Sequence, residues 1–152
     1  MASTQVSQIV KAPRAAVYRA CLDPEMIVRW RVPDIMTGEI HSFDAREGGG
    51  YRMSLTYRDD DHPIGGKTSA HTDSFHGRFL ELIPDTKIVE AVRFETNAPD
   101  LRAPMTLTTS FREVDGGTEV TILCENLPPG VRAEDNELGT RQSLKKLAAL
   151  FA

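Results

Sequence analysis

The chain contains little cysteine. Its 152 residues include two, Cys21 and Cys124. They lie far apart and inside apolar patterns rather than in C-x-x-C spacing, which predicts two reduced, buried thiols. A disulfide stays open but is not needed, because a chain of this length buries roughly 68–70% of its unfolded surface and can form a core without crosslinks.

Long hydrophobic runs are also missing. No apolar stretch approaches the roughly 20 residues of a membrane-spanning helix. The first residues, Met1 to Gln5, have neither the basic region nor the apolar core of a signal peptide. We therefore expect a cytoplasmic protein that does not insert into membranes. The length and the ordinary shares of hydrophobic (40%) and charged (26%) residues predict a single globular domain over residues 1–152.

Basic residues are fewer than acidic ones, and the sequence lacks motifs that bind metal ions or nucleotides. The net charge is −4, which argues against a nucleic-acid partner. No histidine or cysteine spacing suits zinc, so no metal site is expected. The chain shows no nucleophile beside a base, no phosphate-cradling loop and no dinucleotide fingerprint. We therefore expect no cofactor, and no catalytic residue can be named.

In the middle of the chain, apolar residues recur at every second position. Tyr51, Met53, Leu55 and Tyr57 alternate with polar residues, which is typical of a half-buried strand. Other strands are expected over residues 4–11, 39–46, 68–83, 87–95, 104–114 and 118–126. The acidic run at residues 59–61 falls in a polar loop between two of these strands.

Helical periodicity is expected at three places. A short helix over residues 14–22 follows Pro13, and a second begins at the N-cap Asp23 and ends at Pro33. A long amphipathic helix follows the break at residues 128–130 and runs to the end of the chain. Its apolar stripe is formed by Leu138, Leu144, Leu147, Ala148 and Phe151.

The order of these elements indicates a fold. Sequential strands joined by short turns form an antiparallel sheet. The apolar face of that sheet needs a cover, and the terminal helix is the only long amphipathic element available. The sequence therefore predicts an α+β protein, in which a curved antiparallel sheet of about six to seven strands wraps around a long C-terminal helix. Two short helices lie between the first two strands, and a pocket can lie beneath the helix.

Five stretches carry a resemblance to a known family. They are KAPRAAVY (residues 11–18), LDP (22–24) with RW (29–30), FDAREGG (43–49), GRFLELIP (77–84) and ELGTRQSLKKL (137–147). Together they resemble the helix-grip fold of the SRPBCC superfamily, which includes START lipid-transfer domains, birch-pollen-allergen-like proteins and polyketide cyclases. Within it they are similar to the AHSA1-like branch, relatives of the activator of the ninety-kilodalton heat-shock chaperone ATPase.

The resemblance implies three kinds of function. Short members of the branch are single small-molecule-binding domains, so the leading hypothesis is a protein that holds a hydrophobic or amphipathic molecule between sheet and helix. Cyclase, dehydratase or hydrolase chemistry in the same cavity is the alternative. A chaperone-ATPase co-regulator or other protein-interaction module ranks last, because the activators use a further domain to contact the chaperone. The branch often has two aromatic residues where this chain has Trp30 and Arg31, which implies a more polar pocket at that point.

Aromatic, methionine and leucine positions on the expected inner faces give candidate cavity-lining residues. These are Trp30, Tyr51, Met53, Tyr57, Phe79, Leu107, Phe111, Leu144 and Leu147. Core packing explains many of them about as well. Trp30 fits two roles equally, as a cavity wall or as a plug between helix and sheet. The tyrosine hydroxyls favour a pocket, because a buried hydroxyl needs a partner.

Polar candidates are few. His41 and His76 are polar groups for the cavity, and with Tyr57 they are the titratable residues that an enzyme would need, although a solvent-facing histidine is the simpler interpretation. Apolar residues alternate with polar ones along the strand at residues 87–95, and this alternation places Arg93 on the outer surface. A solvated ladder of charges accounts for Glu81, Glu90 and Glu95, which could pair across strands with Arg78 and Arg93. Homodimerisation through an edge strand stays open.

Overall fold

The structure of the chain is a computed structural model that describes residues 2–58 and 72–152. Over these residues the chain forms seven strands and three helices. In chain order they are β1 (Thr4–Val10), α1 (Arg14–Ala20), α2 (Pro24–Trp30), β2 (Met36–Phe43), β3 (Gly50–Tyr57), β4 (Thr72–Ile83), β5 (Lys87–Phe94), β6 (Met105–Val114), β7 (Gly117–Glu125) and α3 (Ala133–Ala149).

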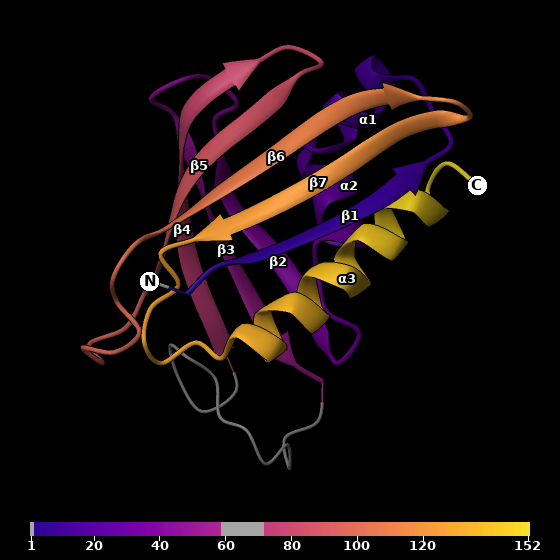
Figure 1. The fold of residues 1–152 in the computed structure, drawn as a ribbon. Helices are drawn as coiled ribbons and strands as arrows, with labels where there is room; N and C mark the ends of the chain where they lie inside the picture. The colour runs from indigo at the N-terminus through magenta and orange to yellow at the C-terminus, as the bar shows by residue number, and fades with distance from the viewer. Residues whose placement is uncertain (1, 59–71) are drawn as a thin grey trace.

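The strands form one antiparallel sheet in the order β1-β7-β6-β5-β4-β3-β2. Figure 1 shows this sheet strongly curled, with α3 running along β1 and with α1 and α2 on the far side of the view. Because α3 also contacts α2, the helices close the hollow side of the sheet. This architecture confirms the predicted α+β helix-grip fold, with two short helices between β1 and β2.

Local sequence explains where the short helices begin. Asp23 caps α2, since its Oδ1 accepts a hydrogen bond from the backbone N–H of Glu25 at 3.0 Å. Pro24 occupies the first turn of α2, where the missing N–H of proline would have had no helical partner. Pro13 stands directly before α1. The predicted N-cap at Asp23 is therefore confirmed.

The second strand lies further toward the N-terminus than predicted, over Met36–Phe43 rather than residues 39–46. Gly38 belongs to this strand, where it pairs with Leu55 on β3, and the segment before the strand approaches it closely. A Cβ at Gly38 would lie 2.6 Å from Cγ2 of Val32, so glycine here serves packing rather than a turn. The strand ends at Phe43, where the Asp44 N–H donates to the Gly50 carbonyl at 2.8 Å and closes the turn.

One continuous core lies between the inner face of the sheet and the helices. Cys21 and Cys124 are free and buried, as predicted. None of the described helices combines the length and the apolar character needed to cross a membrane. The predicted loop around residues 59–66 and the first part of the predicted strand 68–83 lie outside the described residues.

Candidate functional site

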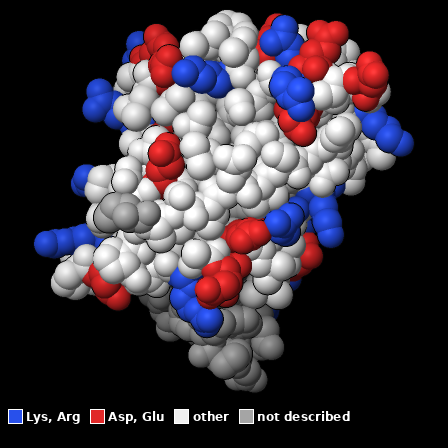
Figure 2. All heavy atoms as spheres, viewed as in Figure 1, with Lys and Arg blue, Asp and Glu red and all other residues white. Residues whose placement is uncertain are grey.

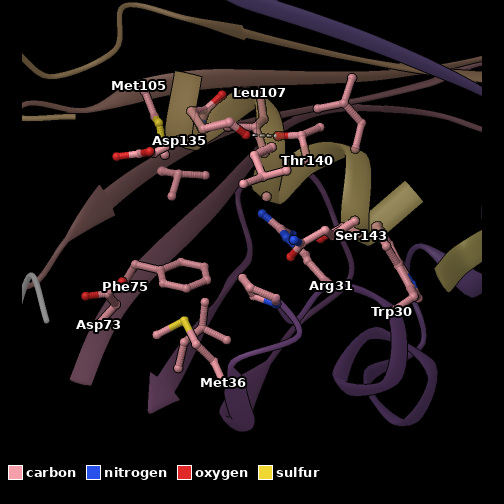
Figure 3. Close-up of a pocket in the computed structure, with 18 of the residues that line it drawn as sticks. Trp30, Arg31, Met36, Asp73, Phe75, Met105, Leu107, Asp135, Thr140 and Ser143 are labelled. Carbon is pink, nitrogen blue, oxygen red and sulfur yellow. Dashed lines mark hydrogen bonds between the residues drawn. The ribbon is translucent and has the colours of Figure 1, made fainter. Parts of the chain in front are cut away.

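The inner face of the sheet does not pack fully against the helices, and a cavity of about 500 Å³ remains. Its walls come from α2 and the segment after it, from the inner faces of β2 to β7, and from one side of α3. Figure 3 shows labelled side chains from the end of α2, from β2, β4 and β6, and from α3 around a common space. The apolar walls include Trp30, Met36, Phe75, Val92, Met105 and Leu107.

The structure brings three of the nine predicted lining residues into this cavity, namely Trp30, Tyr57 and Leu107. Trp30 combines both roles that the sequence left open. It lines the cavity, and it is also 3% exposed, with its indole N–H donating to the Ala20 carbonyl at 3.1 Å.

The other six predicted lining residues lie in the core, outside the cavity lining. They are Tyr51, Met53, Phe79, Phe111, Leu144 and Leu147, and each is buried. Their positions on the inner faces are as predicted, but neighbouring side chains cover them. Phe79 and Tyr51, for example, face each other with ring centroids 5.7 Å apart.

The two histidines proposed as polar cavity groups are on the outer face of the sheet, and neither belongs to the lining. The His76 side chain is 56% exposed and lies 3.4 Å from the Glu95 carboxylate. His41 lies 2.8 Å from the Ser54 hydroxyl and 3.0 Å from the Glu39 carboxylate. The expectation of a cavity histidine is therefore corrected. His76 directly follows Phe75, which faces inward, so it must point the opposite way.

The polar centre of the cavity is a buried cluster of Arg31, Glu90 and Tyr51. Arg31 Nη2 donates to Glu90 Oε1 at 3.2 Å, with the two side chains 17% and 5% exposed. The Tyr51 hydroxyl donates to the same carboxylate oxygen. The Arg31 guanidinium also lies 5.2 Å from the centre of the Tyr51 ring, a cation–π distance. Arg31 and Glu90 line the cavity, and Tyr51 supports them from the core.

A glycine on β4 makes this cluster sterically feasible. Tyr51 on β3 pairs with Gly77 on β4, and Gly77 pairs with Val92 on β5. A Cβ on Gly77 would lie 2.1 Å from Cζ of Tyr51, so the ring lies directly over the glycine. In this way the hydroxyl reaches across β4 to Glu90 on β5.

Burial and mutual charge set the protonation of the cluster. Burial and the Glu90 carboxylate raise the pKa of the Tyr51 hydroxyl well above its ordinary value, so Tyr51 remains a donor. Burial opposes the charge of Arg31, but the attraction and hydrogen bonding of Glu90 and Tyr51 together outweigh it and raise the pKa of Arg31. Burial raises the pKa of the Cys21 thiol, in the cavity wall, to about 12. A thiol with such a pKa is protonated and unreactive at neutral pH.

Glu90 corrects the prediction of a solvated charge ladder. Of the three glutamates, Glu81 is 3.6 Å from Lys87 and Glu95 is 2.7 Å from Arg52, both on partly exposed side chains. Glu90 instead is 4% exposed.

The sequence did contain the information that places Glu90 inside. Ile88, Glu90 and Val92 follow one another at a spacing of two, and all three are buried. Their shared parity puts the carboxylate on the inner face of the sheet. By the same rule Arg93 points outward, and it is exposed as predicted.

The mouth of the cavity lies between the segment after α2 and the N-terminal half of α3. Ile35 and Leu138 line it and are nonetheless 49% and 57% exposed. The segment is fastened to α3 by Lys146, whose Nζ lies 2.8 Å from Asp34 Oδ1 and also donates to the Val32 carbonyl.

On the face of the molecule seen in Figure 2, neither positive nor negative side chains dominate the surface. Acidic and basic side chains alternate around its margin, and its middle, over β6, β7 and β1, is largely uncharged. In residues 2–58 and 72–152, no three histidine, cysteine, aspartate or glutamate side chains come together in a way that could hold a metal ion.

Comparisons with known proteins agree with this geometry. The sequence profile of the family described as Activator of Hsp90 ATPase homolog 1-like protein matches residues 11–152. The crystal structure of protein CV1439 from Chromobacterium violaceum has 32% identity, covering 98% of this chain and 96% of its own, with a TM-score of 0.86. Protein Mll3558 from Rhizobium loti has 27% identity, covering 97% and 95%, with a TM-score of 0.75.

A more distant structure is that of DynU16, from the dynemicin biosynthetic locus. It has 17% identity, covers 97% of this chain and 46% of its own, and has a TM-score of 0.68, which shows a common fold alone. Among curated proteins, none matches this chain significantly.

Proposed function

The chain belongs to the family of activator of Hsp90 ATPase homolog 1-like proteins, and we propose that it binds a small hydrophobic or amphipathic molecule in the cavity between sheet and α3. The observation that carries this proposal is the unfilled, mainly apolar space of about 500 Å³ in an otherwise continuous core. Ligand pockets have this size and this character, with a small number of convergent polar groups.

The physical basis of affinity would be burial of apolar ligand surface. Each Å² removed from water contributes about 25 cal/mol before the cost of ordering the ligand is subtracted. The exposed apolar side chains Ile35 and Leu138 at the mouth provide a surface on which such a molecule can first settle.

Enzymatic use of the cavity has weaker support. Of the three titratable candidates, Tyr57 alone lines the cavity, while His41 and His76 lie on the outer face. The buried Glu90 is already held by Arg31 and Tyr51. We therefore favour binding without chemistry.

A fluorescence titration tests the proposal. Trp30 is the single tryptophan and lines the cavity, so its emission reports on occupancy. A panel of hydrophobic and amphipathic molecules should include members that change the emission in a saturable way. Native mass spectrometry of protein from its source would then identify what it carries.

A matched pair of variants locates the binding. Gly139 lines the cavity, and a Cβ added there meets no atom within 4 Å, so Gly139→Phe should place its ring at the mouth and abolish the titration. Ala149 is exposed on the same helix and outside the lining, so Ala149→Phe should titrate like the unmodified protein. Equal binding by both variants would contradict a ligand in the cavity.

A further inference from the structure

We infer that the cavity selects an electrically neutral headgroup that both donates and accepts a hydrogen bond, such as a hydroxyl, at the end of an apolar body. This inference rests on the proposed binding function and specifies its ligand class. It follows from the unused hydrogen-bonding capacity of Glu90 and Arg31 and from the charges that surround them.

Glu90 offers an unused acceptor. Both of its hydrogen bonds, from Arg31 and from Tyr51, end on Oε1. In the described parts of the chain Oε2 accepts none. Because Glu90 is 4% exposed and lines the cavity, water of the bulk solvent does not reach it freely. A buried carboxylate oxygen without a donor is costly, so a ligand that donates a hydrogen bond here gains affinity.

Arg31 offers unused donors beside that acceptor. A guanidinium has five N–H groups, and one of them, on Nη2, bonds to Glu90. The Tyr51 hydroxyl is a second polar neighbour of the guanidinium, and the remaining N–H groups have no hydrogen-bond partner among the described residues. Figure 3 shows the Arg31 side chain extending from the end of α2 into the space lined by Phe75, Leu107 and Ser143. A ligand acceptor can therefore meet Arg31 while its own hydrogen meets Glu90.

The charge balance argues against an ionic headgroup. Arg31 and Glu90 already neutralise each other at 3.2 Å. An anion at this point would adjoin Glu90, and a cation would adjoin Arg31. Asp135 also belongs to the lining, where Arg31 is the single basic residue among those described, so an anionic ligand is disfavoured further. Bringing an unpaired charge into such a site is costly.

Two more hydroxyls extend the polar surface that a neutral headgroup would meet. Thr109 on β6 and Ser143 on α3 are 4% and 8% exposed and line the cavity. Neither side chain forms a hydrogen bond to another residue within the described ranges. Each can donate or accept, so they suit a hydroxyl better than a fixed charge.

Four ligands with similar apolar bodies test the inference by calorimetric titration at neutral pH. They are n-octanol, its isomer heptyl methyl ether, octanoate and octylammonium. We expect n-octanol to bind about ten-fold more tightly than the ether, which lacks a hydrogen-bond donor. We expect it to bind at least about ten-fold more tightly than either ion.

The outcomes separate the two proposals. Equal affinities for all four ligands, or tighter binding of octanoate or octylammonium, would overturn the inference while leaving a cavity that binds small molecules. If none of the four binds, the inference and the proposed function both fail.

Two variants examine the cluster itself. Glu90→Gln leaves the Arg31 charge without its counter-ion, so the preference should move toward octanoate by about ten-fold or more. The double variant Arg31→Met with Glu90→Met removes both charges and is the safer variant for folding, since apolar replacement of a buried ion pair is often tolerated. It should lose most of the preference for n-octanol over the ether, with the Thr109 and Ser143 hydroxyls still present. Unchanged ratios of the four affinities in either variant would overturn the role of the cluster.

Discussion

The Tyr51 hydroxyl donates a hydrogen bond to the Glu90 carboxylate from two strands away, since Tyr51 lies on β3, Glu90 on β5, and β4 runs between them. The contact joins the aromatic part of the core to the polar end of the cavity. It depends on the missing side chain of Gly77, over which the tyrosine ring lies.

Replacement of that glycine should therefore be disruptive. In Gly77→Ala the new Cβ would lie 2.1 Å from Tyr51 Cζ, and the ring has little room to move because Phe43, Phe75 and Phe79 surround it. Overpacking of this kind costs about 1–3 kcal/mol. Urea unfolding of the variant should show that loss.

The same substitution elsewhere provides the control. Gly139→Ala, in the middle of α3 and with no atom within 4 Å of the added Cβ, should stabilise the protein by up to about 1 kcal/mol through helix propensity. If the Gly77→Ala variant were as stable as the unmodified protein, the placement of the Tyr51 ring over Gly77 would be contradicted.

Removal of Arg31 alone should be more harmful than removal of both charges. Arg31→Met leaves the Glu90 carboxylate, 5% exposed, without its cation, which costs about 3–5 kcal/mol. Adding Glu90→Met should restore much of that stability. Denaturant unfolding of the two single variants and the double variant measures the coupling energy. Additive losses would show that the two side chains do not form a buried pair.

Stability should fall at alkaline pH, and Cys21 should account for part of the fall. Burial raises the pKa of the Cys21 thiol from the ordinary 9.0 to about 12. Above pH 9 the unfolded chain therefore loses this proton while the folded chain keeps it, which lowers the free energy of unfolding by up to about 1.4 kcal/mol per pH unit until the folded thiol ionises.

The variant Cys21→Ala isolates this contribution. Its unfolding free energy should decline less steeply above pH 9 than that of the unmodified protein, because the other groups with raised pKa values, Tyr51 among them, remain in both. Identical slopes in urea unfolding series at several alkaline pH values would contradict a protonated, buried thiol.

The contact between Lys146 and the segment after α2 should control ligand exchange. Lys146→Met removes both the ion pair with Asp34 and the hydrogen bond to the Val32 carbonyl, so the mouth should open more often. We expect association and dissociation of n-octanol to be several-fold faster in stopped-flow fluorescence. Lys145→Met, at an exposed neighbouring position, should leave both rates unchanged, and equal rates in the two variants would argue against a gating contact.

Local patterns sufficed to predict the architecture. The Asp23 cap and the alternation of Tyr51, Met53 and Leu55 depend on residues near each other in the chain, and both hold in the structure. The start of β2 was predicted three residues too late, at residue 39 instead of Met36. The strand includes Gly38, whose close contact with Val32 no local pattern reveals.

The site was harder to predict because periodicity assigns a face but not the space beside it. Met53 and Phe79 share inner faces with true lining residues, yet they are fully covered by the core. Arg31 and Glu90 are 59 positions apart in the chain, so their pairing appears only when α2 and β5 meet. The inward position of Glu90 could have been predicted from its parity with Ile88 and Val92.

The most direct test of the central claim is to map where a small molecule sits. Backbone amide chemical shifts should be followed by nuclear magnetic resonance while n-octanol is added. A ligand in the cavity should perturb Arg31, Leu107 and Ser143, from three different walls of the cavity, with a common affinity. Perturbations confined to exposed apolar positions on the outside, such as Ile9 and Leu80, would contradict it.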